Sequence, residues 1–256
     1  MTGTRRDPGR SVMSKAFAIL NVFSEGRCEA TLTDICQTTG LPLTTALRLA
    51  RELVACGALE RATDGRYRVG LRLWETGTLA TPSRDLRTKA LPLMQDLYEL
   101  THENVQLAVI DRGEALVLEK IEGRRTTQIW SRVGGRLPLH ATGLGKALLA
   151  NSKAEVLHEV CRDGLRPYTP HTLVMPGRLA ADLDEIRRRG YAINREEMQL
   201  GRSSVAAPVI GTNDEIVASI GVGVRSLGLT IPSLAPAVCA AAAEITKALA
   251  RQTSAV

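Results

Sequence analysis

Two short helical patterns separated by a glycine turn occupy residues 31–57. In the first, Thr31 precedes Asp34 by three residues, as in a capping box, and Gly40 is a natural stop for a helix. In the second, which follows Pro42, the polar side chains share an arc of about 120° when each residue turns the helix by roughly 100°. The polar set is Thr44, Thr45, Arg48, Arg51 and Glu52. This order is typical of a helix-turn-helix, whose second helix enters the major groove of DNA.

A basic hairpin pattern follows the second helix. The segments Leu59–Arg61 and Tyr67–Val69 are typical of short strands, and Asp64 with Gly65 is typical of the turn between them. The hairpin carries three basic side chains, Arg61, Arg66 and Arg68. Each element alone is equally well explained as an amphipathic helix or a solvated hairpin. The ordered set favours a winged helix-turn-helix.

The polar side chains of these elements suit contacts to DNA. Arginine can bond a guanine edge through two hydrogen bonds or pair with a phosphate, and threonine offers a hydroxyl and a methyl group. We therefore expect DNA contacts from Thr44, Thr45, Arg48 and Arg51 of the helix and from Arg66 and Arg68 of the hairpin. Leu43 falls on the apolar side of the helical wheel, so we expect it to be buried.

Charge and cysteine content narrow the class of protein. The net charge is +6, and residues 1–80 carry half of it although they are less than a third of the chain, which favours an anionic partner such as nucleic acid. Aromatic residues are only 3% of the chain, which argues against base-stacking platforms. The five cysteines form no C-x-x-C pair, and no metal-ligand pattern joins them to the four histidines. We expect reduced, mostly buried thiols and no metal or other cofactor.

No segment predicts a membrane anchor. The first ten residues lack the apolar run of a signal peptide, and the longest apolar stretch, residues 231–245, is broken by two prolines. We therefore expect a soluble, cytoplasmic protein.

The remaining chain alternates strand and helix patterns. We divide the sequence into a basic N-terminal arm (1–10), a winged helix-turn-helix domain (11–72), a linker helix (73–84) and a larger domain (85–256). In the larger domain a helical pattern containing Pro92 comes first, and a glycine-rich segment later enters a helix at 140–150. A hairpin pattern lies at 104–123 with its turn at 111–113. Strand patterns lie at 126–134, 191–194, 203–210 and 215–224, and a last helical pattern lies at 234–250. The mixture predicts an α+β domain, a sheet flanked by helices.

Several segments together match one known family. They are TDICQTTGLPLTTALRLARELVACGALE, GGRLPLHATGLGKALLA, RRRGYAINREEMQLGRSSVAAPV and IVASIGVGV. In these the chain resembles the IclR family of bacterial transcriptional regulators over nearly its full length. The resemblance implies a winged helix-turn-helix domain, a linker helix and a C-terminal GAF-like effector-binding domain. It also implies homodimers or tetramers on palindromic double-stranded operator DNA, with RNA polymerase as a further candidate partner.

The resemblance also implies where a small organic acid effector binds. The backbone at Gly143 and Leu144 contributes, and a glycine-rich loop at a helix N-terminus favours an anionic oxygen. Other matching positions differ in type from many relatives: Asn194 replaces an acidic residue, Ser204 replaces Cys, and Gly221 and Gly223 replace a pair of serines. We expect a roomier, less polar effector site and a larger acid, with aromatic acids as candidates.

Two other functions are weighed against a regulator of a catabolic operon, for which repression is favoured over activation. The first is a constitutive DNA-binding protein with a degenerate sensor domain. The second is a hydrolase in which Ser204 and His140 act as nucleophile and base. The sequence lacks a G-x-S-x-G motif and an evident acidic partner, so we expect no catalytic residues and no enzyme.

Overall fold

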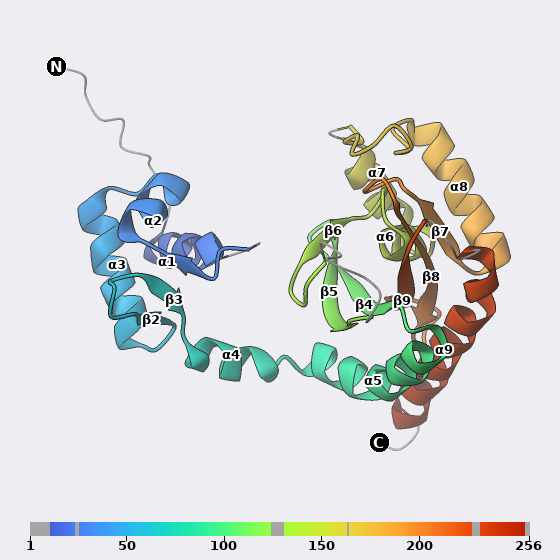
Figure 1. Cartoon of the computed structure of the whole chain (residues 1–256), viewed down its shortest axis with the longest axis horizontal. Helices are drawn as coiled ribbons and strands as arrows, with labels where there is room; N and C mark the ends of the chain where they lie inside the picture. The colour runs from blue at the N-terminus through green and yellow to red at the C-terminus, as the bar shows by residue number, and fades with distance from the viewer. Residues whose placement is uncertain (1–10, 24–25, 124–130, 163, 227–230, 254–256) are drawn as a thin grey trace. The chain divides into compact units, whose positions relative to one another are not determined.

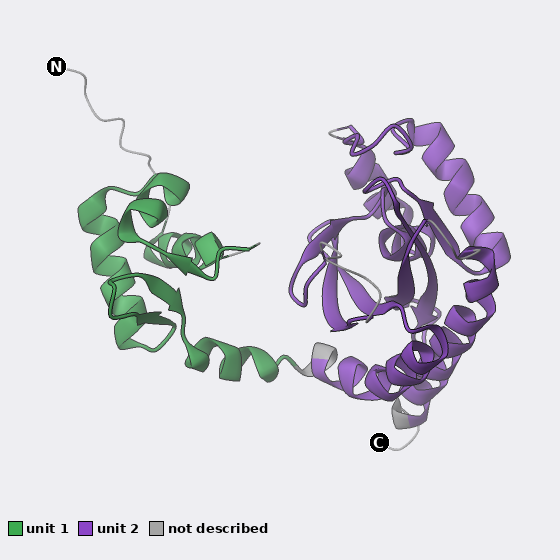
Figure 2. Cartoon of the chain, in the orientation of Figure 1, with its two compact units in different colours: residues 1–81 green, residues 82–256 purple. Residues whose placement is uncertain are grey.

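The structure, a computed structural model, describes residues 11–23, 26–123, 131–162, 164–226 and 231–253. The chain forms two compact units, residues 1–81 and 82–256, which Figure 2 colours separately. The predicted basic arm, residues 1–10, lies outside the described residues. Both units mix helices with a sheet, so the predicted α+β class is confirmed (Figure 1).

The first unit is a winged helix-turn-helix. Its elements are α1 (Val12–Leu20), η1 (Asn21–Phe23), β1 (Glu29–Ala30), α2 (Leu32–Thr39), α3 (Leu43–Ala55), β2 (Leu59–Arg61), β3 (Tyr67–Val69) and α4 (Leu71–Thr78). The predicted capping box is present, since Thr31 and Asp34 each accept from the other's backbone N–H, and Gly40 ends α2 at a φ of 69°. The short β1 adds a third strand to the wing, in the order β1-β3-β2. With only two residues, this strand has no periodic pattern that could have predicted it.

A small apolar core fixes α3. Ala46, Leu49 and Leu53 of α3 pack with Ile35 of α2 in this core. The prediction that Leu43 is buried is wrong, because its side chain is 59% exposed. Leu43 is the first residue of α3, and helical side chains tilt toward the N-terminus, so this one extends past the core.

Glycine permits a close backbone crossing where the wing meets α4. A Cβ at Gly70 would lie 2.2 Å from the carbonyl oxygen of Gly57, so only glycine fits there without a backbone shift. Arg72 Nη1 also donates to the Cys56 carbonyl at 3.2 Å. These two contacts hold the first turn of α4 against the C-terminal end of α3. None of the α4 residues is buried.

The second unit is built on one antiparallel sheet of six strands in the order β6-β5-β4-β9-β8-β7. Its strands are β4 (Asn104–Asp111), β5 (Glu114–Ile121), β6 (Arg136–Pro138), β7 (Ala192–Arg195), β8 (Arg202–Ile210) and β9 (Ile216–Arg225). Its helices are α5 (Thr81–Thr101), α6 (Gly143–Ala150), α7 (Ala154–Arg162), α8 (Pro176–Arg189) and α9 (Ile231–Thr253). The prediction of a hairpin turning at residues 111–113 is confirmed.

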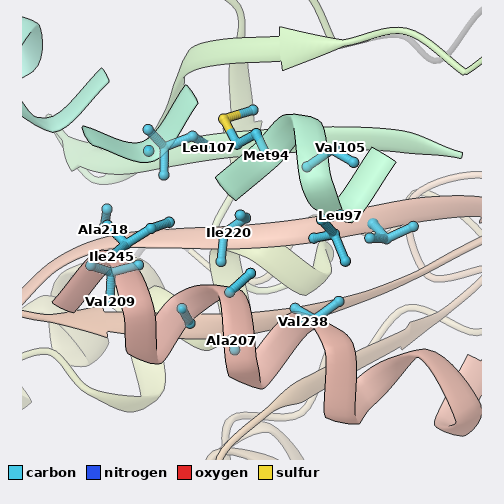
Figure 3. Packing of buried hydrophobic residues seen from close by; sticks show 14 of the residues in the cluster. Met94, Leu97, Val105, Leu107, Ala207, Val209, Ala218, Ile220, Val238 and Ile245 are labelled. Carbon is cyan, nitrogen blue, oxygen red and sulfur yellow. The ribbon is translucent and has the colours of Figure 1, made fainter. Parts of the chain in front are cut away.

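The two faces of the sheet carry different side chains, because successive residues of a strand point to opposite faces. One face packs against α5 and α9 in a dry core, where Figure 3 shows aliphatic side chains of both helices beside those of β4, β8 and β9. The labelled residues include Met94, Leu97, Leu107, Ile220 and Val238. The other face meets α6 and α8 through small residues such as Ala108 and Ala206.

Some sequence predictions differ from the structure. Of the predicted strand at 126–134, residues 126–130 lie outside the described part, and residues 131–134 are not a strand. The edge strand is β6 instead, which pairs with β5. The cysteines are free thiols, but none is fully buried, so the prediction of mostly buried thiols is wrong.

Helix α9 is long and apolar. Residues Ile231–Arg251 are long and apolar enough to cross a membrane by length and composition. However, Ala235, Val238, Ala241 and Ile245 of this helix belong to the core against the sheet. One face of the helix therefore packs against the sheet, and its prolines lie near its N-terminal end.

Candidate functional site

Helix α3 presents a polar face to solvent. Thr44, Arg48 and Arg51 are exposed and Thr45 is half-buried, while the opposite side of the helix is buried in the core. The structure therefore places all four predicted residues of this helix on one accessible surface. Among the described residues, neither Arg48 nor Arg51 has an ion-pair partner. Both guanidinium groups are available to an external anion.

The wing arginines are exposed but already paired. Arg68 Nη2 lies 2.8 Å from Glu60 Oε2, and Arg66 Nε lies 3.4 Å from Asp64 Oδ2. The hydrogen bond from Arg68, followed by that from the Leu71 N–H, lowers the pKa of Glu60. Glu60 thus joins Arg68 of the wing to the start of α4, whereas the longer Arg66 pair is more than half exposed and can exchange for a phosphate.

In the second unit, the N-terminus of α6 is a candidate anion site. Thr142 caps the helix by accepting from the Gly145 N–H at 3.0 Å. The N–H groups of Gly143 and Leu144, in the first turn, have no intrahelical acceptor. The side chain of Leu144 is buried in the core, so this residue can offer a ligand only its backbone. The predicted role of both residues through the backbone is compatible with this geometry.

Glycine at 143 lets α6 approach the sheet closely. A Cβ there would lie 2.6 Å from Ser204 Oγ, so the serine hydroxyl faces the first turn of the helix directly. Ser204 is only half-buried, and its hydroxyl has no hydrogen-bond partner within the described part of the chain. The first turn of α6 and this hydroxyl therefore lie side by side.

Strand register aligns a row of residues beneath the α6 N-terminus. Asn194 pairs with Ser204, Ser204 pairs with Gly223, and Gly223 pairs with Asn104. Directly opposed residues point to the same face of a sheet. The row thus crosses β7, β8, β9 and β4 on the face that α6 covers. It brings together Asn194, Ser204 and Gly223, which the sequence predicted, and adds Asn104, which it missed.

Gly221 does not enlarge this site. A Cβ at Gly221 would lie 2.8 Å from Ala206 Cβ and 3.2 Å from Leu144 Cδ2. Neighbouring atoms of Ala206 and Leu144 therefore fill the space above Gly221, and the absence of a side chain there does not widen the site. Asn194 is also committed, because its Nδ2 donates to the Ala141 carbonyl in the loop before α6.

Two buried polar residues of β4 escaped the sequence analysis. Asn104 and Gln106 alternate with Val105 and Leu107, and both lie on the α6 side of the sheet. Gln106 Nε2 donates to Ser131 Oγ. The alternation of polar and apolar residues was visible in the sequence. However, that pattern normally indicates a solvated face, so it gave no sign that these amides are buried.

A buried ion cluster joins α6 to α8 and to the segment after β7. Lys146 Nζ lies 2.8 Å from Asp182 Oδ2 of α8 and 2.7 Å from Glu197 Oε1, which follows β7. Lys146 is 1% exposed and Glu197 6%. Burial raises the pKa of Glu197, and the nearby Lys146 charge opposes that rise. The sequence gave no signal for this cluster, because its three members are far apart along the chain.

The residues proposed for a hydrolase are not assembled as a catalytic pair. His140 Nε2 lies 3.0 Å from the Arg166 carbonyl oxygen, and its ring contacts Tyr168. Ser204 Oγ faces Gly143 instead. The described residues also contain no group of three His, Cys, Asp or Glu side chains that could hold a metal ion.

Comparison with known proteins adds independent evidence. The family model described as bacterial transcriptional regulator IclR C-terminal matches residues 78–251, and the IclR helix-turn-helix domain model matches residues 12–63. The HTH-type transcriptional regulator XynR of Escherichia coli is 33% identical over 210 residues, which are 81% of this chain and 83% of that protein. The transcriptional repressor IclR of the same organism is 31% identical over 214 residues, 82% and 78% of the two chains.

Solved structures agree with this similarity. An IclR homolog from Microbacterium hydrocarbonoxydans, complexed with 4-hydroxybenzoate, superposes with a TM-score of 0.88 at 31% identity, over 94% of this chain and all of that one (100%). IclR of Thermotoga maritima superposes with a TM-score of 0.75 at 28% identity, over 93% and 98% of the two chains.

Proposed function

We propose a specific role for this chain, which belongs to the IclR family of bacterial transcriptional regulators and is therefore a ligand-responsive, DNA-binding regulator. In the cytoplasm it binds a palindromic operator beside a catabolic operon and represses transcription until an organic acid is bound. The observation that carries this proposal is the exposed face of α3, where the side chains of Thr44, Arg48 and Arg51 have no bonding partner among the described residues. Relatives whose names include repressor, such as AllR of Escherichia coli, support repression over activation.

In this proposal Thr44, Thr45 and Arg48 contact base edges. Arg51 and Arg66 contact phosphates, which positions the helix without reading sequence. We assign Arg68 mainly to holding the wing, because its guanidinium is already bound by Glu60 at 2.8 Å. A single α3 reads few base pairs, so specificity requires two copies whose recognition helices lie about 34–36 Å apart in successive major grooves.

Exposed apolar side chains of the first unit support a homodimer. Phe17 and Met13 of α1 are 59% and 66% exposed, and Trp74 of α4 is 67% exposed. Large apolar groups that gather on short helices usually mark a protein interface. We assign these faces of α1 and α4 to the contact between two copies. A tetramer would require a further contact through the second unit, and RNA polymerase is a candidate partner of the bound complex.

The effector in this proposal is an organic acid with more than three carbons. Its carboxylate accepts from the N–H groups of Gly143 and Leu144, and Ser204 donates to it from the sheet. We place the rest of the molecule over Gly223, which has no side chain and pairs with Ser204, and Asn194 holds the loop before α6 in place. The relative complexed with 4-hydroxybenzoate makes aromatic acids the first compounds to test.

One experiment tests the regulatory role and the effector class together. DNA fragments bound by the protein are selected and sequenced with and without benzoate-type acids, and with pyruvate as a three-carbon control. We expect a palindromic site that is released by an aromatic acid. Release by pyruvate alone would contradict the effector class. Binding that no acid changes would instead favour a constitutive DNA-binding protein.

A hydrolase is tested separately. Ester hydrolysis that is abolished in Ser204→Ala would favour catalysis. Operator binding that is unaffected by the substitution would support the regulatory function.

A further inference from the structure

Asn104 is a buried amide with an unused donor. Its side chain is 1% exposed, and its Oδ1 accepts from the Gly123 N–H at 3.2 Å. Within the described part of the chain, Asn104 Nδ2 has no hydrogen-bond partner. Buried donors are nearly always satisfied in folded proteins, so an orphan of this kind calls for a missing acceptor.

The position of Asn104 relates this donor to the effector site. It lies on the α6 side of the sheet, directly opposite Gly223, which in turn lies opposite Ser204. Asn104 and Ser204 are thus two strands apart, about 10 Å between their backbones, with a residue that has no side chain between them. Nothing from Gly223 itself blocks a molecule that reaches from one to the other.

The neighbouring amides already bond to other groups of the protein. Gln106, the next residue on the same face, already donates to Ser131 Oγ. Asn194, at the other end of the row, donates to Ala141. Among the described side-chain amides of this row and the adjacent Gln106, Asn104 alone has a side-chain nitrogen that makes no hydrogen bond.

We propose that Asn104 selects effectors that carry a hydrogen-bond acceptor at the end opposite the carboxylate. This inference rests on the proposed function, which places the carboxylate at Gly143 and Ser204. An acid that binds there and extends over Gly223 presents its far end to Asn104 Nδ2. A carbonyl, ether or hydroxyl oxygen at that end satisfies the buried amide, whereas an apolar end leaves it unsatisfied. Acids of two or three carbons are too short to make both contacts.

Two acids of matched shape test this selectivity. 4-Acetylbenzoate ends in a carbonyl oxygen, and 4-isopropylbenzoate has a methyl group in its place. We expect calorimetric titration of the full chain to give about tenfold tighter binding of the acetyl compound, the effect of one buried hydrogen bond. Equal affinity for the two acids would overturn the proposal.

Variants identify the residue responsible. Asn104→Leu keeps the approximate size but cannot donate, so the two acids should bind equally. Asn104→Thr retains a hydroxyl donor and suits a strand, so it should keep part of the preference even if the leucine variant folds poorly. The control Asn213→Leu removes an exposed amide in the turn between β8 and β9 and should keep the full tenfold ratio.

The outcomes separate this inference from the proposed function. An undiminished preference in Asn104→Leu would overturn the role of Asn104 while leaving the effector class intact. Failure of both acids to bind a protein that still binds its operator would overturn the inference and the effector class, but not the DNA-binding role. If the wild-type chain bound no operator at all, that result would instead contradict the proposed function itself.

Discussion

Replacing Lys146 with methionine tests whether the buried ion cluster holds the effector domain together. Methionine has a similar length and no charge, so Lys146→Met removes the cation while keeping most of the packing. It leaves the Glu197 carboxylate, 6% exposed, without its partner at 2.7 Å. Removing one member of a buried pair typically costs about 3–5 kcal/mol. Asp182 is more solvated and adds less to that cost.

The expected size of the effect can be measured by calorimetry. For a unit of this size, each kcal/mol shifts the melting temperature by about 2–4 °C, so the loss corresponds to roughly 6–20 °C. The matched control is Lys247→Met, because Lys247 lies the same 2.7 Å from Glu244 but is 61% exposed. An exposed pair of this kind contributes little, so we expect the control to melt like the wild type.

The dependence on pH gives the sharper test. The pKa of folded Glu197 is raised by burial, and loss of Lys146 removes the charge that opposes this rise. When the pKa of a carboxyl is higher in the folded than in the unfolded state, its protonated form stabilises the folded state. That contribution is complete below the unfolded pKa, about 4.3, and is lost as the pH rises through the folded pKa. The deficit of Lys146→Met should therefore be largest above neutral pH and shrink as the pH falls toward that unfolded value.

A second substitution completes the cycle. Lys146→Met combined with Glu197→Gln removes both charges, and we expect it to recover much of the lost melting temperature at pH 8. A deficit that is the same at pH 5 and pH 8, or a single variant as stable as the Lys247 control, would refute the reasoning. Either result would mean that the cluster is solvated in solution.

Further substitutions test packing and DNA contacts. Gly145→Ala should destabilise the protein by about 1–3 kcal/mol in urea unfolding, because its Cβ would lie 2.6 Å from backbone atoms that cannot move aside. Gly143→Ala should cost clearly less, since its Cβ meets a serine hydroxyl that can rotate away; equal costs would contradict this distinction. Arg48→Ala should weaken operator binding by about 1–3 kcal/mol and relax preference at one base pair, whereas equal loss on all sequences would make Arg48 a phosphate contact. Arg66→Ala should weaken binding to every sequence and lower the salt slope by about one; an unchanged slope measured by titration at several salt concentrations would exclude a phosphate contact.

The DNA-binding unit was the more predictable half because its signals are local. The capping box at Thr31, the stop at Gly40 and the two wing strands each depend on residues close together in the sequence. Where the helical wheel failed, at Leu43, the reason was the end of the helix. A wheel treats every turn alike, but the first turn of α3 extends beyond the elements that cover the rest.

The effector site was predictable only in part, since it depends on strand register. The resemblance named Ser204 and Gly223, but nothing in the sequence placed Asn104 beside them, because β4 and β9 are separated by more than a hundred residues. The same holds for the buried Lys146. Its partners become neighbours only after α6 and α8 have packed on the sheet.

The crossing of Gly70 with Gly57 anchors only the first part of the segment that connects the two units. The start of α4 is fixed to the recognition helix, whereas residues 79 and 80, between α4 and α5, are exposed. Inserting one or two residues there would leave both units able to fold. The insertion would lengthen the connection without changing a residue of α4 or α5. The length of this segment is therefore a feature of the sequence that can vary without altering the contacts within either unit.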